Sequence, residues 1–241
     1  MLIAGFAAGP LGANCYVVGA APGGECVVID PGQDSSAGVD RLVAEHAVRP
    51  AAVLVTHGHF DHMWQAQEVA DRYDAPLWVG ADDRHLLSDP MAAISNESAA
   101  MLRQQLRMES VPDFREPGTV REATGGSVIE IDGLTVVVDH APGHTPGTVL
   151  YRVEYDGPED VSQVMFSGDF LFAGSIGRTD LVGGDHGEML ESLRSRVLPL
   201  ADDVVVLPGH GDQTSIGRER ATNPFLLDLT RDLTRDLTQD A

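Results

Sequence analysis

The chain has 241 residues, 43% of them hydrophobic and 5% aromatic, so it can bury a sizeable core built mainly from aliphatic side chains. It is strongly acidic: 37 Asp and Glu oppose 16 basic residues, all of them Arg, for a net charge of -21. This charge disfavours nucleic acids and anionic membrane surfaces as partners, because both are bound through Lys and Arg.

Nine short apolar runs, most of them rich in Val and bounded by Gly, Pro or Asp, predict β-strands. In chain order they are Cys15–Val18, Cys26–Ile29, Ala52–Val55, Leu77–Val79, Val128–Ile131, Thr135–Val138, Val149–Val153, Gln163–Phe166 and Val204–Leu207. Between some of these runs, helices are predicted at Val39–His46, Met63–Tyr73 and Gly187–Val197, the last with Asp185 as a candidate N-cap.

The segment 85–120 differs from the rest because it contains a helical run near Asn96–Met108 and no strand. It is predicted to be an inserted helical piece or lid. The tail repeats every four residues, so its leucines would stack on one face of a short C-terminal helix around 224–238. Since no linker divides the chain, we expect one domain over residues 1–241.

The N-terminus and the cysteines bear on cellular location. The first residues are apolar but lack a positive start and are broken by Gly and Pro, unlike a signal peptide. No run of about eighteen apolar residues predicts a membrane span. If residues 19–25 form a hairpin turn, Cys15 lies opposite Ile29 and not Cys26, so no disulfide is expected. A cytoplasmic protein is predicted.

The acidic composition has two explanations that the sequence leaves open. Carboxylate repulsion is easiest to tolerate in strong salt, because the Debye length falls to about 3 Å at 1 M. One hypothesis is therefore a high-salt cytoplasm, and the other is an ordinary acidic protein.

A cluster of metal-binding side chains follows the predicted strand at Ala52–Val55, in the string THGHFDH. His57 and His59, two positions apart, can point the same way from an extended loop. Asp61 and His62 fall on the next turn and can face a second centre. Imidazole and carboxylate suit divalent zinc, iron or manganese, and a solvated loop would not need three of the nine histidines.

Three further apolar runs end in tight, Gly-containing loops that carry one candidate ligand each. These are His144 in PGHTPG, Asp169 in SGDF and His210 in PGHG. If the strands are neighbours, the loops converge at one edge, where glycine lets the backbone approach closely. Five histidines and two aspartates suffice for two divalent metal ions, with zinc expected first and iron or manganese as alternatives.

The order THGHFDH, PGHTPG, SGD and PGHG resembles the metallo-β-lactamase superfamily. Within it, NCYVV, IDPG, SGDFLFAGSIGRTDL and NPFL are similar to the glyoxalase II-like, hydroxyacylglutathione hydrolase-type branch. The resemblance runs from about residue 12 to residue 226. It implies an α/β fold, the αβ/βα metallo-β-lactamase sandwich of two mixed β-sheets flanked by helices, with the metals at one edge.

The resemblance also implies a role for each ligand. His57, His59 and His144 would hold the first metal, Asp61, His62 and His210 the second, and Asp169 would bridge them. An Asp at the bridging position departs from the main zinc β-lactamases, which have a Cys. Asp30, in the IDPG turn, is expected to hydrogen-bond the histidine loop without touching metal.

The leading hypothesis for function is hydrolysis of a thioester by a hydroxide that two metals share. Asp61 could orient this hydroxide or take its proton, and the metals would stabilise the oxyanion, so no Ser or Cys nucleophile is needed. The expected substrate is a small-molecule S-acyl thiol such as a hydroxyacylglutathione or an analogue on another low-molecular-weight thiol. Arg178 could pair with a substrate carboxylate, or form a structural ion pair with Asp180.

Other readings use the same framework. Full glyoxalase II enzymes carry an added C-terminal helical region, whereas only a short tail follows His210 here, which leaves the thiol open. The first alternative is a persulfide dioxygenase with one iron on His57, His144 and Asp169, and the next is a lactone or β-lactam hydrolase. An RNA-processing nuclease is disfavoured by the charge, and a non-enzymatic binding protein would be expected to have lost ligands.

Overall fold

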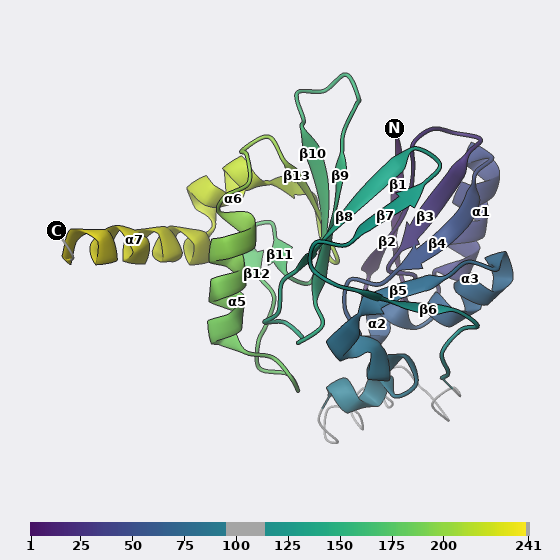
Figure 1. Ribbon diagram of the computed structural model, residues 1–241, viewed down its shortest axis with the longest axis horizontal. Coiled ribbons are helices and arrows are strands. Elements are labelled where there is room, and N and C mark those ends of the chain that lie inside the picture. Colours follow the sequence, from purple (N-terminus) through teal and green to yellow (C-terminus); the bar gives the residue numbers. More distant parts are fainter. Residues whose placement is uncertain (95–113, 240–241) are drawn as a thin grey trace.

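The computed structural model of the chain describes residues 1–94 and 114–239. Two six-stranded β-sheets lie face to face, with helices outside them (Figure 1). The first sheet is ordered β1 (Leu2–Ala8), β2 (Ala13–Gly19), β3 (Glu25–Ile29), β4 (Arg49–Leu54), β5 (Leu77–Gly80), β6 (Val120–Ala123). The second is ordered β14 (Thr214–Ser215), β13 (Val205–Pro208), β10 (Gln163–Gly168), β9 (Val149–Glu154), β8 (Leu134–His140), β7 (Val128–Ile131). A small ribbon pairs β11 (Leu171–Phe172) with β12 (Ser175–Ile176).

Both sheets mix parallel and antiparallel pairs. Strands β1 to β3 are antiparallel, whereas β3, β4, β5 and β6 are parallel neighbours. In the second sheet β7 to β10 are antiparallel and β10 is parallel to β13. Parallel neighbours send their carboxyl ends to the same edge of a sheet. The loops after β10 and β13 therefore leave the second sheet together.

The main core lies between the two sheets. Along β8, buried Leu134, Val136 and Val138 alternate with less buried residues, which is the period-two pattern of a strand with one inward face. These side chains pack with Leu54 of the first sheet, and each fully buried Val or Leu stabilises the fold by about 1.5–3 kcal/mol. The buried Tyr151 hydroxyl donates to the backbone oxygen of Val55, 3.0 Å away, and so links the sheets beside the histidine loop.

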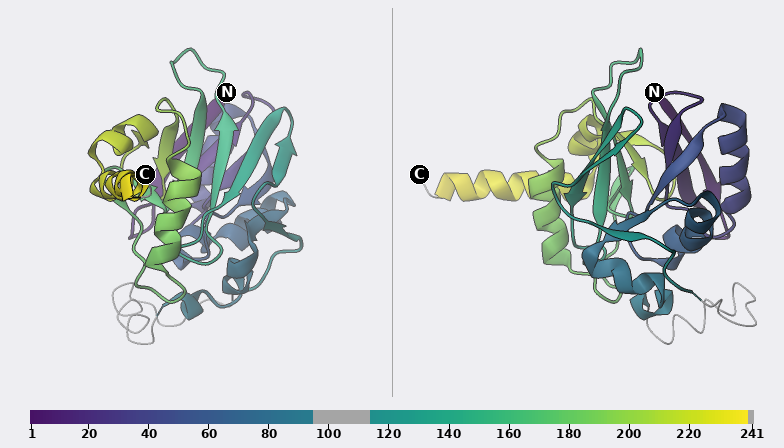
Figure 2. Two further views of the ribbon diagram at one scale, coloured as in Figure 1. Left: turned by 60° about the vertical axis from the view of Figure 1, so that its left-hand side comes forward. Right: turned by 45° about the vertical axis from the view of Figure 1, so that its right-hand side comes forward.

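Helices cover the outer faces, as Figures 1 and 2 show. On the first sheet lie α1 (Ser36–His46), α2 (Phe60–Met63) and α3 (Ala66–Tyr73), and on the second lie α5 (His186–Ser192) and α6 (Ile216–Thr222). Helix α7 (Pro224–Gln239) packs at its start and then projects away from the sandwich (Figure 1). Val39 of α1 and Val69 of α3 belong to one outer core, and Met189 of α5 and Leu226 of α7 belong to the other. The predicted αβ/βα sandwich of two mixed sheets flanked by helices is confirmed.

Several element predictions need correction. The predicted helix Met63–Tyr73 is split into α2 and α3, because Gln65 leaves helical geometry and its side-chain oxygen accepts from the Ser36 backbone N–H. Strands β1 and β6 and the short β11, β12 and β14 were not predicted. The hairpin is offset by one residue, since Tyr16 and not Cys15 pairs with Ile29, but both cysteines are free as expected.

Other predictions hold or fall outside the described residues. All nine predicted strands occur, Asp185 caps α5 by accepting from the Glu188 N–H at 2.9 Å, and α7 matches the predicted C-terminal helix. The described part of segment 85–120 contains the end of the 3-10 helix Ala81–Leu87, the 3-10 helix Pro90–Ala93 and the first residue of β6. The run near Asn96–Met108 lies outside the described residues. Among the described helices, none has the length and apolar character needed to cross a bilayer.

Candidate metal centre

The seven predicted ligands meet where the segments that follow four strands converge. Asp61 and His62 lie in α2, and the other five lie in loops. The seven form three groups of possible metal ligands, each with its nitrogen and oxygen atoms within 4.8 Å of one another. The first group is His57, His59 and His144, and the second group is Asp61, His62 and His210. The third, His57, His62 and Asp169, shares a histidine with each of the other two. Shared members make the three groups one continuous cluster.

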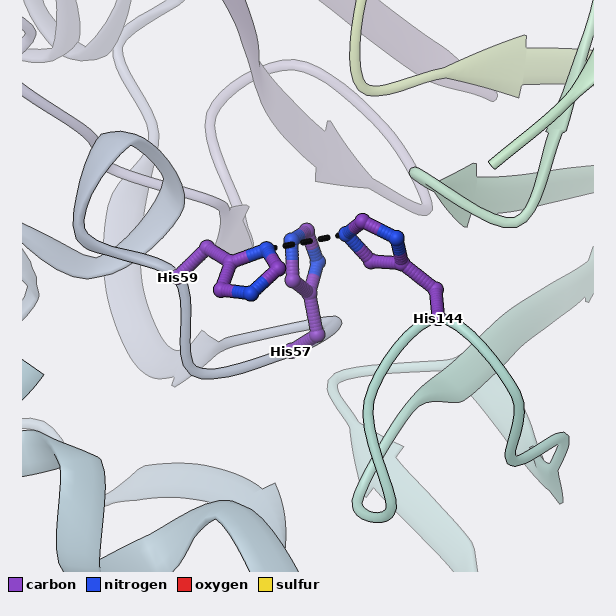
Figure 3. Close-up of side chains that lie close together, drawn as sticks. All are labelled: His57, His59 and His144. Atoms are coloured by element: carbon purple, nitrogen blue, oxygen red, sulfur yellow. Dashed lines mark hydrogen bonds between the residues drawn. The ribbon is translucent and has the colours of Figure 1, made fainter. Parts of the chain in front are cut away.

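The first group consists of three histidines from two loops. His57 and His59 come from the loop after β4, and His144 comes from the loop between β8 and β9; their rings converge in Figure 3. His59 Nδ1 and His144 Nε2 are 2.9 Å apart. All three side chains are buried, so their nitrogens face each other with little solvent.

The second group lies beside it, with Asp169 between the two. His210 Nε2 is 3.3 Å from His62 Nε2 and 3.2 Å from Asp61 Oδ2. Asp169 lies 3.2 Å from His62, 3.6 Å from His210 and 3.9 Å from His144 by carboxylate oxygen to Nε2 distance. One carboxylate therefore reaches imidazoles of both groups, which is the arrangement required of a bridging ligand.

Hydrogen bonds outside the cluster set the tautomers of three histidines. Asp30 is buried and accepts from His62 Nδ1 at 3.0 Å and from the Thr56 hydroxyl at 2.7 Å. Because that hydroxyl donates to Asp30, it accepts from His57 Nδ1, 3.1 Å away. His144 Nδ1 donates to the Arg178 backbone oxygen at 2.8 Å. The Nε2 atom of each of these histidines is thus turned into the cluster, the role that outer hydrogen bonds play around metal-binding histidines.

The donor atoms fit metal ions. Two atoms of the cluster, His57 Nε2 and Asp169 Oδ1, are buried and have no hydrogen-bond partner among the described residues. Leaving such atoms unpaired costs about 1–3 kcal/mol each, and an imidazole and carboxylate set of this kind suits zinc, iron or manganese.

Burial and neighbouring charges shift the pKa values of the two sides of the cluster differently. Burial, reinforced by nearby histidines, holds the pKa of His57 well below its ordinary value and lowers the pKa of His59 to about 3. Burial likewise lowers the pKa of His144. These three imidazoles are neutral near pH 7, the form that binds metal.

The carboxylate side of the cluster favours positive charge. Burial opposes ionisation of Asp61 and Asp169, but the neighbouring imidazoles, His62 first, outweigh it and lower the pKa of both carboxyls. Burial also opposes charge on His62, yet Asp169 and Asp61 outweigh it and raise its pKa well above the ordinary value. Two ionised carboxylates thus stabilise a cation here.

Asn14 and Tyr16 hold the loop that carries His210. The Asn14 side-chain amide donates to the backbone oxygens of Pro208 and Gly211, at 3.0 Å each, and the Tyr16 hydroxyl donates to Pro208 at 2.8 Å. Sequence motifs alone do not reveal this role, because the contacts join residues nearly two hundred positions apart. The NCYVV string, which the resemblance singles out, contains both residues but assigns neither of them a role.

Of the two predicted roles of Arg178, the structure shows the ion pair with Asp180. Its guanidinium makes two hydrogen bonds to the Asp180 carboxylate, at 2.7 and 2.8 Å, and both side chains are largely exposed. Arg178 nevertheless lines an open cavity of about 290 Å³ beside the cluster. The other lining residues are Leu11, His59, Phe60, Asp61, Ile94, His144, Asp169 and Leu181.

Curated relatives extend over most of the chain. An uncharacterized protein of Mycobacterium tuberculosis is 44% identical over 232 residues, which is 96% of this chain and 100% of that protein. The hydroxyacylglutathione hydrolase GloC of Haemophilus influenzae is 32% identical over 199 residues, covering 83% of this chain and 86% of the relative.

Solved structures also match over most of the chain. The BLEG-1 B3 metallo-β-lactamase matches with a TM-score of 0.76 and 36% identity, over 93% of this chain and 99% of that one. TTHA1623 in a di-iron-bound form matches with a TM-score of 0.71 and 33% identity, over 92% and 100%. The family model described as the metallo-β-lactamase superfamily matches residues 8–210, and the chain belongs to that superfamily.

Proposed function

We propose that the protein is a metal-dependent thioesterase that hydrolyses S-acyl derivatives of low-molecular-weight thiols, with hydroxyacylglutathione as the reference substrate. The observation that carries the proposal is the pair of ligand groups on either side of Asp169, opening into the cavity. The similarity to a hydroxyacylglutathione hydrolase over most of both chains supports the choice of thioesters.

Two metal ions would be held by the seven clustered residues. His57, His59 and His144 would hold one, Asp61, His62 and His210 the other, with Asp169 shared. Zinc is our first choice, and the di-iron form of a similar structure supports iron as the alternative. When bound, such a pair supplies an activated water near neutral pH and positive charge for a developing oxyanion.

The chain's own residues would orient the reaction. Asp61 lines the cavity and its lowered pKa keeps the carboxylate ionised, so it would orient an attacking water by accepting a hydrogen bond from it. Leu11, Ile94 and Leu181 give the cavity an apolar wall against which an acyl group can pack. The bonds from Arg178 to Asp180 use Nε and one Nη2 proton, so the Nη1 edge of the guanidinium would bind a substrate carboxylate.

A substrate panel tests this proposal. Metal-loaded protein is given S-lactoylglutathione, acyl thioesters of smaller thiols, a lactone, a β-lactam and glutathione persulfide, while thiol release and oxygen uptake are recorded. We expect thiol release from at least one thioester with no oxygen uptake. One iron per chain with oxygen uptake on the persulfide would instead support the dioxygenase, and turnover of the lactone or β-lactam alone would support the third reading.

A further inference from the structure

We propose that Asp83 is a positioning residue that holds the two loops of the first histidine group in register. It lies in the 3-10 helix Ala81–Leu87, directly after β5, and its side chain is fully buried. It does not belong to any of the three groups of possible ligands. Any effect on the cluster must therefore act through the loops.

One carboxylate binds both loops. Asp83 Oδ2 accepts from the Gly58 backbone N–H at 2.8 Å, and Gly58 stands between His57 and His59. The same oxygen accepts from the hydroxyl of Thr145, the residue after His144, at 2.6 Å. Segments more than eighty residues apart in sequence are thus tied through one atom next to their metal-binding side chains.

The second oxygen fixes the far end of the same loop. Asp83 Oδ1 accepts from the Gly147 backbone N–H at 2.8 Å. The approach is close: a Cβ at Gly147 would lie 2.5 Å from the Asp83 backbone nitrogen, so only glycine fits there. The Thr148 hydroxyl, 2.7 Å from that of Thr145, completes a compact loop.

A packing role alone does not account for these contacts. Burying a carboxylate is costly unless donors compensate it. In the described part of the chain Asp83 has no ion pair, and its donors come from the two histidine loops. Two of the three donors are adjacent in sequence to a histidine of the first group, so we assign the carboxylate to keeping His57 and His59 facing His144. The third, Gly147, is three positions after His144 and closes the same loop.

The second group is held by different residues. Asp30 orients His62, while Asn14 and Tyr16 hold the His210 loop. Loss of the Asp83 carboxylate should therefore weaken the first group selectively. This inference rests on the proposed function only in that the cluster binds metal.

The test compares Asp83→Asn with Asp82→Asn, a matched change at the exposed neighbouring position. The amide keeps the shape but turns an NH₂ group toward a backbone or hydroxyl donor. Outer-shell changes typically weaken metal binding by about 10–100-fold. In Asp83→Asn we expect a loss of that size for one of two zinc ions in chelator competition, with the other retained. Diffraction at the zinc edge should show that the His57 side empties first. Asp82→Asn should match the parent protein.

A second readout does not need metal. Amides of Gly58 and Gly147 should exchange hydrogen faster in Asp83→Asn, with circular dichroism unchanged. If that variant does not fold, Thr145→Val removes one donor at similar volume and should show a smaller change in the same direction. Unchanged zinc affinity and unchanged exchange in a folded Asp83→Asn would overturn the proposal. Failure of the thioester panel would leave these readouts intact and refute only the proposed function.

Discussion

At the scale of single residues, hydrogen bonds from outside the cluster orient three of its histidines, His57, His62 and His144. Asp30 sets the tautomer of His62 directly and that of His57 through Thr56. The meeting of the seven candidate ligands could be predicted from sequence because each follows an apolar strand, either in a loop or, for Asp61 and His62, in the short helix α2. Asp83 could not be predicted in this way, because its role arises from contacts that form only in the folded sandwich.

Replacing Asp169 by Ala tests the residue on which the two-metal assignment depends. Loss of this carboxylate removes negative charge between the two groups and one ligand from each, so repulsion between two dications is less compensated. We expect the second metal equivalent to be lost. Turnover should fall by more than about 100-fold, because losing a direct ligand should cost more than losing a residue that only orients one. Metal content, turnover and circular dichroism measure the outcome.

The control for this change is Asp160→Ala, at an exposed position between β9 and β10. It removes one negative charge from a loop of the second sheet, away from the cluster, and should leave turnover near the parent value. If Asp169→Ala keeps two metals and near-normal turnover, Asp169 is not the bridge.

At the scale of elements, strand ends create the centre and their loops are held by neighbouring strands. The nine predicted strands were recognisable because Val-rich runs end at Gly, Pro or Asp. Strands β1 and β6 were missed because they lie at sheet edges and alternate buried with exposed residues only weakly. The break at Gln65 was missed because it depends on its contacts with Pro31 and Ser36.

Asn14→Ala tests whether the side chain of Asn14, in β2, fixes the position of the His210 loop. The change removes two hydrogen bonds to loop carbonyls, each worth about 1 kcal/mol. We expect the free energy of unfolding to fall by about 1–2 kcal/mol and the metal of the second group to dissociate first. This is the reverse of the order expected for Asp83→Asn.

Denaturant unfolding and chelator competition measure both effects. Gln213→Ala, at an exposed position just after the loop, is the matched control and should change neither quantity. Equal loss of both metals in Asn14→Ala would contradict a separate hold on each group.

At the scale of the whole molecule, the apolar cores and the metal cluster are distinct. Three core clusters, one between the sheets and two beneath the outer helices, bury the aliphatic side chains without the ligands. We therefore expect removal of metal to leave the fold intact. The organisation as one domain and the two explanations of the acidic composition stay predictions.

Reconstitution of metal-free protein tests the central claim most directly. The protein is stripped by a chelator, its fold is checked by circular dichroism, and thioester hydrolysis is followed as zinc or iron is added back. We predict negligible hydrolysis without metal and activity that saturates at two equivalents per chain. Hydrolysis by the folded, metal-free protein at the rate of the reconstituted protein would contradict the account.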